Sequence, residues 1–293
     1  MADPKTKSIL FHSCTVDTAP QAASFQLQNA YLFSMTSKKT ILITGASSGL
    51  GRALAKAYAS PETHLFLTAR NRVRLEESAD IARKFGAEVS TDSLDIRDHQ
   101  AVQQWVTHAS RFGPIHTALS NAGITGSHSA DGSIETAETA QSQIETNLCG
   151  SINLVTAVTP FMQKQGFGQI GLISSLAGLQ PISDGPAYGA SKAGIIAYGE
   201  AIRDHLYSSG ISVSVLCPGY IRTPMADQFK SWRPLEYSAD QAALKIKRAV
   251  EKRRALYAFP TALAISIALG KLLPWKLRRL AQQRFNYDRS GES

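Results

Sequence analysis

The stretch "TILITGASSGLG", residues 40–51, joins a short apolar run to a loop of glycine and serine. The apolar, β-branched start predicts a buried strand, and the helix-forming run "GRALAKAYAS" follows from Gly51. In a strand–loop–helix unit, Gly45 permits the tight turn, Gly49 lets the backbone approach a pyrophosphate, and Gly51 allows close packing of helix and sheet. Free N–H groups at the helix N-terminus favour phosphates. The stretch therefore predicts dinucleotide binding rather than a purely structural turn.

Further predicted strands follow along the chain, with helical stretches between them. They cover residues 64–70, 87–96, 115–123, 168–175 and 211–219. Strands that alternate with helices of about 10 to 15 residues are typical of a parallel sheet covered by helices on both faces. The predicted fold class is therefore α/β, a Rossmann-type doubly wound parallel sheet in a single domain with a helical C-terminal extension.

Composition divides the chain into three parts. Residues 1–36 carry few charges and no periodicity, so we expect either a disordered extension or a start of translation at Met35. Residues 37–240 are expected to form the catalytic domain, and residues 241–293 a basic and apolar helical tail. This tail holds twelve of the 31 Lys and Arg but three of the 23 Asp and Glu. The rest of the chain is close to neutral, which argues against binding of nucleic acid.

The three cysteines are far apart in the sequence, and none of their spacings is typical of metal ligands. They are Cys14, Cys149 and Cys217. This pattern indicates a reducing, cytoplasmic compartment and predicts no metal site.

The stretch "PAYGASKAG", residues 186–194, places Tyr188 four residues before Lys192. On a helix this spacing puts both side chains on one face. A tyrosine has a pKa near 10, and we expect the neighbouring ammonium to lower it towards the range useful for general acid–base catalysis. A lone pair at this spacing would more simply be a surface Tyr and Lys, so the assignment depends on the other motifs.

Together these motifs resemble the short-chain dehydrogenase/reductase family over about residues 38–230. The matching features are the Gly-x3-Gly-x-Gly loop with Thr44 before it, "SNAG" (120–123), Asn147 in "ETNLCG", Ser175 thirteen residues before Tyr188, and "PG" (218–219) with Thr223. The resemblance implies a sheet with strand order 3-2-1-4-5-6-7. It also implies a homo-oligomer formed through the two long helices that bear Asn147 and Tyr188.

The predicted catalytic residues are Asn147, Ser175, Tyr188 and Lys192. Tyr188 donates a proton to a carbonyl oxygen, or removes one from a hydroxyl, while Ser175 hydrogen-bonds the same oxygen. Lys192 tunes Tyr188 and, as the resemblance implies, holds the nicotinamide ribose. By the same resemblance, Asn147 anchors a water that links Lys192 to solvent.

The residues after the second strand indicate the cofactor. NAD enzymes usually have an acidic residue there, but this chain has Ala69 followed by Arg70, which can pair with a 2′-phosphate. NADP(H) is therefore preferred, although Ser48 stands where the family often has a second basic residue, which leaves NAD(H) open. The predicted cofactor-binding residues are Gly45, Ser47, Ser48, Gly49, Leu50, Gly51, Arg70, Asp95, Ile96, Asn121, Tyr188, Lys192, Pro218, Gly219 and Thr223.

The tail contains an uncharged segment, residues 255–270, with basic groups on both sides. Ser238 or Asp240 is the expected N-cap of a helix before it. As a helix, the segment would be about 24 Å long against a hydrocarbon core of about 30 Å. It fits either membrane-surface contact through residues 255–280, or helices that fold over the substrate cleft or build an oligomer interface.

The predicted function is an NADP(H)-dependent oxidoreductase that interconverts a carbonyl and a secondary alcohol. A catalytically silent nucleotide-binding regulator or scaffold, a membrane-associated module, and an epimerase or dehydratase of nucleotide sugars are the alternatives. Apolar residues after Gly219 suggest a lipophilic substrate. They are Met225, Phe229, Trp232 and Leu235.

Overall fold

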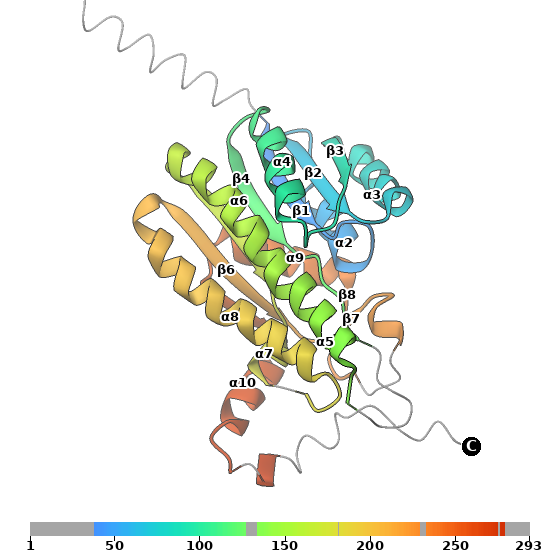
Figure 1. Cartoon of the computed structure of the whole chain (residues 1–293), viewed down its shortest axis with the longest axis vertical. Helices are drawn as coiled ribbons and strands as arrows, with labels where there is room; N and C mark the ends of the chain where they lie inside the picture. The colour runs from blue at the N-terminus through green and yellow to red at the C-terminus, as the bar shows by residue number, and fades with distance from the viewer. Residues whose placement is uncertain (1–37, 127–133, 181, 229–232, 275, 279–293) are drawn as a thin grey trace, which may run out of the picture. The chain divides into compact units, whose positions relative to one another are not determined.

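Seven parallel strands form the central sheet of the computed structural model, in the order β3-β2-β1-β4-β5-β6-β9. This order confirms the predicted doubly wound sheet (Figure 1). The strands are β1 (Lys39–Thr44), β2 (Thr63–Ala69), β3 (Glu88–Ser93), β4 (Ile115–Ser120), β5 (Gly168–Ile173), β6 (Ile211–Pro218) and β9 (Leu256–Phe259). The structure describes residues 38–126, 134–180, 182–228, 233–274 and 276–278. The predicted N-terminal extension lies outside them.

Helices cover both faces of the sheet. One face carries α4 (His99–Ser110), α6 (Gly150–Gln165) and α8 (Pro186–Leu206), which lie in front of the strands in Figure 1. The other face carries α2 (Gly49–Tyr58), α3 (Arg72–Lys84) and α9 (Ala239–Glu251). Shorter elements complete the fold: α5 (Ala137–Ile144), η1 (Glu145–Cys149), α7 (Leu176–Leu179), η2 (Tyr207–Ser209), β7 (Ile221–Arg222), η3 (Ala226–Gln228), β8 (Tyr237–Ser238) and α10 (Thr261–Gly270).

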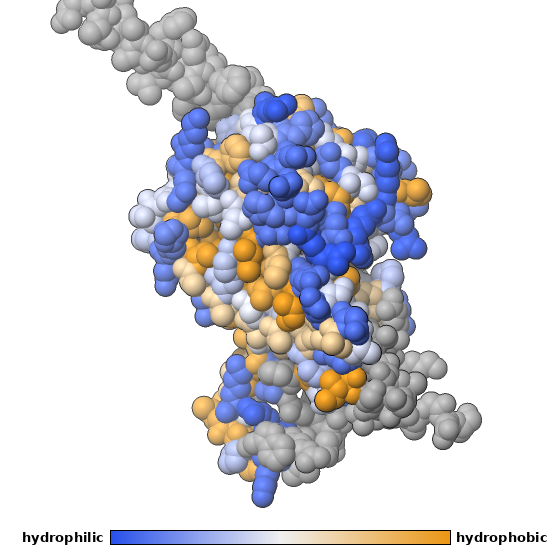
Figure 2. Space-filling model, in the orientation of Figure 1, coloured by the Kyte–Doolittle hydropathy of each residue, from blue (hydrophilic) through white to orange (hydrophobic). Residues whose placement is uncertain are grey.

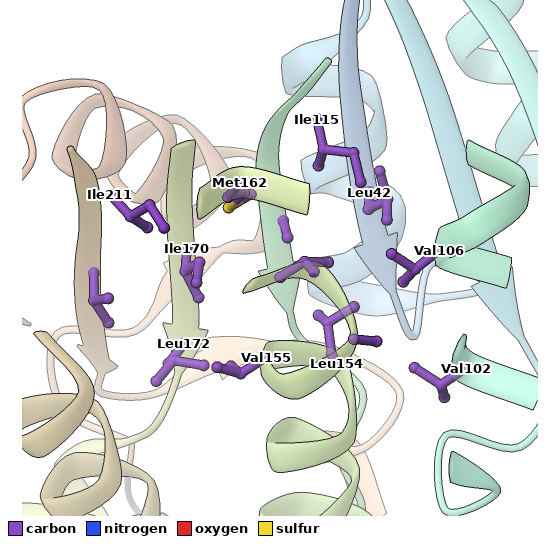
Figure 3. Packing of buried hydrophobic residues seen from close by; sticks show 14 of the residues in the cluster. Leu42, Val102, Val106, Ile115, Leu154, Val155, Met162, Ile170, Leu172 and Ile211 are labelled. Atoms are coloured by element: carbon purple, nitrogen blue, oxygen red, sulfur yellow. The ribbon is translucent and has the colours of Figure 1, made fainter. Parts of the chain in front are cut away.

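Two hydrophobic clusters fill the space between sheet and helices, one on each face. Successive side chains of a strand point to opposite faces, so Leu42 of β1 joins the cluster under α4, α6 and α8. Its neighbours Ile41 and Ile43 join the cluster under α2, α3 and α9. Figure 3 shows part of the first cluster, with Leu42 from β1 and Leu154 from α6 among its labelled residues. Burial on both faces explains why β1 is a continuous apolar run in the sequence.

Local capping residues set the helix boundaries. The Ser238 hydroxyl accepts a hydrogen bond from the Gln241 N–H, and the Gln241 side chain accepts one from the Ser238 N–H. This capping box makes Ser238 the N-cap of α9, one of the two N-caps that the sequence suggested. A glycine follows the C-terminus of α3. This helix ends at Lys84, two residues before Gly86, whose positive φ of 85° suits glycine.

The segment that follows α9 differs from the expected helical tail. Residues 256–259 form β9, which pairs with β6 from Val215 to Pro218, and α10 begins after Pro260. α9 is also integral, because Ala242, Ile246 and Val250 are buried in the second cluster. The sheet therefore takes its seventh strand from beyond residue 240, the expected domain boundary. None of the helices within the described residues is long and apolar enough to cross a membrane.

Candidate active site

The carboxyl ends of the parallel strands open onto a cavity of about 1240 Å³. Ligands of doubly wound sheets bind at this edge, beside the point where the strand order reverses, here between β1 and β4. Every predicted site residue except Asn147 lines the cavity. A sheet edge has thus brought together residues from Gly45 to Thr223.

The glycine loop after β1 is held in a fixed shape. The Asn121 side-chain amide donates hydrogen bonds to the carbonyl oxygens of Thr44 (3.0 Å) and Gly45 (3.2 Å). The Thr44 hydroxyl accepts hydrogen bonds from the N–H groups of Asn121 and Ala122. A Cβ at Gly51 would lie 2.0 Å from the Gly45 oxygen, so no other residue fits there. Asn121 lines the cavity as predicted, but its amide group acts as a clamp on the loop.

The N-terminus of α2 faces the cavity directly after this loop. Residues 47–51 line the cavity, and the N-cap Ser48 forms no side-chain hydrogen bond with the helix. The first N–H groups of a helix have no partner within the helix and favour an anion. The loop and helix end therefore fit a pyrophosphate.

Two arginines line the cavity at the end of β2. Arg70 is exposed, and Arg74 lies in the first turn of α3, where its N–H donates to the Asn71 side chain at 2.9 Å. Within the described residues, neither guanidinium forms an ion pair. Sequence reasoning missed Arg74; its position four residues after Arg70 was the available signal.

Asp95 and Ile96 lie at the cavity wall as expected, but Asp95 already has a partner. Arg97 Nε and Nη2 contact its carboxylate at 2.7–3.1 Å. These hydrogen bonds hold the pKa of the Asp95 carboxyl below its ordinary value. Ile96 is buried, and a Cβ at Gly150 would lie 2.7 Å from its Cγ2, so α6 packs closely against it.

Ser175, Tyr188 and Lys192 meet where β5 ends and α8 begins. Ser175 is the N-cap of α7, and its hydroxyl accepts a hydrogen bond from the Ala177 N–H at 3.1 Å. Lys192 Nζ lies 5.7 Å from the centre of the Tyr188 ring, so both side chains occupy one face of α8, as their spacing predicts. Its ammonium donates to the Ile173 carbonyl oxygen at 2.9 Å.

The expected effect of Lys192 on Tyr188 is wrong for this structure. Burial raises the pKa of Tyr188, and a hydrogen bond with Ser175 lowers it by less. Burial also lowers the pKa of Lys192, which is 4% exposed, to about 8. Loss of hydration is thus the largest influence on the pKa of Tyr188. The Lys192 ammonium lies over the ring and directs its hydrogen bond to the Ile173 oxygen.

Asn147 lies behind the cavity wall, in the single π-helical turn η1 between α5 and α6. Its side chain accepts from the Ile124 N–H at 2.8 Å and donates to the Ile124 oxygen and to the Ser191 hydroxyl, both at 2.9 Å. A Cβ at Gly123 would lie 3.2 Å from Asn147 Oδ1 and 3.5 Å from Lys192 Nζ. The glycine therefore keeps open the space between the predicted catalytic amide and amine.

Buried hydroxyl groups that sequence reasoning missed fix the backbone of α8. Ser191 Oγ donates to the backbone carbonyl oxygen of Tyr188, and Ser174 Oγ donates to that of Lys192, both at 2.8 Å. Ser174 stands directly before Ser175 in the sequence, but nothing in the pattern distinguishes its structural role.

Glu135 lies at the N-terminus of α8, where it contacts Ala187, the residue directly before Tyr188. Its carboxylate accepts hydrogen bonds from the Ala187 N–H and from the Gln143 side chain. The negative charge also suits the positive end of the helix dipole. No sequence signal marked this residue, because 52 positions separate it from Ala187.

Residues 223–226 and α10 form another part of the cavity wall. Thr223 lies beside the glycine loop, because a Cβ at Gly49 would lie 3.2 Å from its Cγ2. Met225 contributes to the wall, as do Leu263 and Ile267 of α10. This favours the expectation that the tail folds over the cleft. Of the other apolar residues singled out earlier, Leu235 is exposed and outside the cavity wall, and Phe229 and Trp232 lie outside the described residues.

Comparisons with known proteins agree with this geometry. The family model described as "short chain dehydrogenase" matches residues 39–234. Ketoacyl reductase HetN of Nostoc sp. is 33% identical over 186 residues, which are 62% of this chain and 63% of that protein. A Streptomyces virginiae protein named as a monensin polyketide synthase ketoacyl reductase is 33% identical over 218 residues, 73% of this chain and 82% of that protein.

Two solved structures share the arrangement of elements. An actinorhodin polyketide ketoreductase variant with NADPH superposes with a TM-score of 0.68 at 25% identity, covering 76% of this chain and 95% of that one. Levodione reductase gives a TM-score of 0.69 at 26% identity, covering 76% and 96%.

Proposed function

The chain belongs to the short-chain dehydrogenase/reductase family, as its motifs predicted, and from this membership we propose that it reduces a lipophilic ketone with NADPH. The family comprises oxidoreductases of CH–OH and C=O groups. The observation that carries the proposal is the meeting of the Ser175 and Tyr188 hydroxyls, beside the buried Lys192, within the cavity that also contains the glycine loop.

Tyr188 is proposed to donate the proton. A ketone oxygen between the two hydroxyls would accept hydrogen bonds from Ser175 and Tyr188, which stabilise the negative charge that develops there. A bound nicotinamide supplies the hydride to the carbonyl carbon. Because burial raises the pKa of Tyr188, the phenol stays protonated at neutral pH and is ready to act as an acid. The Lys192 ammonium then stabilises the phenolate that remains.

The preference for NADPH rests on Arg70 and Arg74. Two guanidiniums without ion pairs among the described residues line the cavity beside the glycine loop, and Ala69 provides no carboxylate for a 2′-hydroxyl. A 2′-phosphate would form charge-assisted hydrogen bonds with one or both. We call residues 45–51 with Arg70 and Arg74 the nucleotide end of the cavity. Titration should therefore show tighter binding of NADPH than of NADH.

The substrate class follows from the apolar part of the cavity wall. Met225, Leu263 and Ile267 line it, and we call these three residues the substrate end. Similar proteins are named for the reduction of ketoacyl and polyketide groups, which supports a ketone on an extended carbon chain. The cavity volume of about 1240 Å³ leaves room for such a chain besides a dinucleotide.

The decisive experiment is a screen of NADPH consumption. Aliphatic, aromatic, steroidal and sugar ketones are compared with β-ketoacyl thioesters, each with the Tyr188→Phe variant alongside. We expect turnover of long-chain ketones by the wild type alone. Tight NADPH binding without consumption for any ketone would instead favour a silent nucleotide-binding regulator.

Three further features are proposed with this function: a cytoplasmic location, contact of the tail with a membrane surface, and a homo-oligomer formed through α6 and α8. Sedimentation velocity of the full chain tests the last, and a monomer at micromolar concentration would contradict it.

A further inference from the structure

Helix α10 is apolar on both sides but covered on one. Leu263 and Ile267 line the cavity and pack against the first hydrophobic cluster. On the opposite side, Ile265 is 55% exposed and Leu269 is 61% exposed, and Leu272 just beyond the helix is 81% exposed. A helix that is hydrophobic all round is normally buried on all sides. The outward side therefore calls for a covering partner.

The polar groups near this side indicate which partner fits. Ser266 of α10 lies on the cavity side, where its hydroxyl donates to the Leu263 carbonyl oxygen at 2.8 Å, so it does not make the outer side polar. Lys271 and Lys276 are exposed just after the helix. Residues 252–287 contain no Asp or Glu. In Figure 2, the part of the molecule where α10 projects shows hydrophobic and hydrophilic patches side by side.

We propose that the outer face of α10, with Leu272 and Leu277, lies in the surface of an anionic lipid bilayer, and that the cavity behind α10 takes its ketone from that bilayer. The second half of this proposal rests on the proposed function. Apolar side chains beside lysines suit the boundary between acyl chains and anionic headgroups. The ten residues of α10 span about 15 Å, half of a hydrocarbon core, so the helix lies along the membrane.

A second copy of the chain is a poorer partner for the same face. A twofold interface brings each patch against itself, so Lys271 and Lys276 would meet the same cations with no acidic residue nearby in the chain. The earlier basic group, residues 252–254, does not contribute to this face. It precedes β9 and therefore lies at the amino ends of the strands, whereas α10 follows their carboxyl ends.

Flotation of the full chain with vesicles tests the first half. Vesicles of phosphatidylcholine with phosphatidylglycerol are compared with vesicles of phosphatidylcholine alone. We expect the wild type to float with the anionic vesicles, and Ile265→Asp/Leu269→Asp to remain at the bottom. Tyr207→Asp is the matched control, because Tyr207 is also a large residue and is 83% exposed. It lies in η2, which precedes β6 and is therefore at the amino ends of the strands, away from α10. Wild-type protein that stays with the soluble fraction overturns the proposal.

The charge contribution has its own control. Lys271→Gln/Lys276→Gln is expected to weaken binding to anionic vesicles on the order of tenfold, since each lysine near such a surface contributes several-fold. Lys84→Gln/Lys164→Gln removes two exposed lysines elsewhere and should leave binding unchanged. Equal losses for both pairs would mean that net charge, and not this face, attracts the protein, and would overturn the assignment.

The second half is tested with two ketones, a short one in water and a long-chain one in vesicles. Ile265 and Leu269 do not line the cavity, so Ile265→Asp/Leu269→Asp should reduce a short, water-soluble ketone at the wild-type rate. A long-chain ketone dissolved in anionic vesicles should be reduced at least about tenfold more slowly, because the variant no longer binds the vesicle. An unchanged rate with the vesicle ketone overturns delivery from the bilayer.

The two levels of the proposal fail separately. If the wild type reduces no ketone in either setting, the proposed function fails, while flotation still decides the role of α10. Sedimentation velocity covers the competing partner. If the double substitution turns an oligomer into a monomer and leaves flotation unchanged, the face belongs to a second copy, and the bilayer proposal is overturned.

Discussion

At the nucleotide end of the cavity the backbone is held by hydrogen bonds, whereas helix α10 at the substrate end is held against the core mainly by apolar packing. Asn121 and Thr44 fix the glycine loop through four hydrogen bonds of 3.0–3.2 Å. At the other end, Leu263 and Ile267 of α10 contact the core through side-chain carbon atoms. The first end accordingly suits a polar ligand of fixed shape, and the second an apolar ligand of variable shape.

This difference also decides what a mutation can do at each end. A Cβ at Gly51 would overlap the Gly45 oxygen, so the nucleotide end tolerates almost no change. On the outer side of α10, Ile265 and Leu269 are more than half exposed, so substitutions there should leave the fold intact. The residues between the two ends, Ser175, Tyr188 and Lys192, should show the largest effects, because both ligands would meet there.

Tyr188→Phe should have the largest effect of all. It removes the hydroxyl that donates the proton, and general acid catalysis contributes roughly 10²- to 10⁴-fold to a rate. We expect kcat for ketone reduction to fall by about that factor, with the Kd for NADPH changed little. Steady-state kinetics and fluorescence titration measure the two quantities.

The control for this variant is Tyr198→Phe, which removes a hydroxyl from the same helix outside the cavity wall. It should retain the wild-type kcat. If Tyr188→Phe kept full activity as well, Tyr188 would not be the acid, and another group in the cavity would have to donate the proton to the ketone.

The buried Lys192, which lies between the two ends of the cavity, should make the free energy of unfolding depend on pH. Burial lowers its pKa from 10.5 to about 8. Below pH 8 the amine is charged in both states, and the cost of burying the charge is fully present. Between about pH 8 and 10 the folded chain loses the proton while the unfolded chain keeps it, so stability rises with pH. The whole shift corresponds to about 3 kcal/mol.

Lys192→Met isolates this contribution. We expect the variant to be more stable than the wild type near pH 7, with the advantage shrinking as the pH approaches 10, when both are unfolded in urea without cofactor. Above pH 10 the raised pKa of Tyr188 acts in the opposite direction, because the unfolded tyrosine ionises first. A difference that stays constant across this range would contradict the low pKa of Lys192.

Sequence reasoning predicted the nucleotide end far better than the substrate end, and the reason is physical. The loop from Gly45 to Gly51 is local, and its shape demands glycine at fixed positions, so a short motif records it. Tyr188 and Lys192 are likewise four residues apart on one helix. The sheet order followed from the family resemblance and was confirmed.

The substrate end left no such record. β9 is four residues long, and its apolar sequence continues into α10, so the pattern alone could not divide strand from helix. Pairing with β6 makes this division, and strand pairing is a non-local contact. The pKa of Tyr188 was mispredicted for a similar reason, since spacing reports the neighbour Lys192 but not the burial that outweighs it.

The double variant Arg70→Ala/Arg74→Ala should have the next largest effect. This effect should be confined to cofactor binding at the nucleotide end. Loss of charge-assisted hydrogen bonds to a 2′-phosphate is worth about 1.5–3 kcal/mol, so the Kd for NADPH should rise on the order of 10- to 100-fold. The Kd for NADH should change little, and the substrate KM likewise. Isothermal titration calorimetry with both cofactors measures this.

Arg72→Ala provides the control, since it removes an exposed arginine from the first turn of α3 that does not line the cavity. Equal weakening by both variants would indicate a general charge effect. Equal weakening of NADH and NADPH by the double variant would show that the arginines do not read the 2′-position.

Glu135→Ala should have the smallest effect, and it tests whether a hydrogen bond at the start of α8 helps to place Tyr188 between the two ends. The Glu135 carboxylate accepts from the Ala187 N–H, next to Tyr188, and from Gln143. Its loss removes an acceptor from the first turn of α8, worth about 1 kcal/mol for a helix end. We expect kcat to fall roughly threefold to fivefold because Tyr188 is less well placed, while the Kd for NADPH stays constant.

Two companions decide between positioning and general destabilisation. Glu135→Gln keeps a carbonyl oxygen for the Ala187 N–H and should recover most of kcat, although it lacks the charge that suits the helix dipole. Glu138→Ala removes an exposed carboxylate from the nearby first turn of α5 and should be neutral in kcat. If Glu135→Ala lowered thermal stability but left kcat at 25 °C unchanged, the carboxylate would stabilise α8 without placing Tyr188. Tyr188 would then be held in place by the packing of α8 and not by this hydrogen bond.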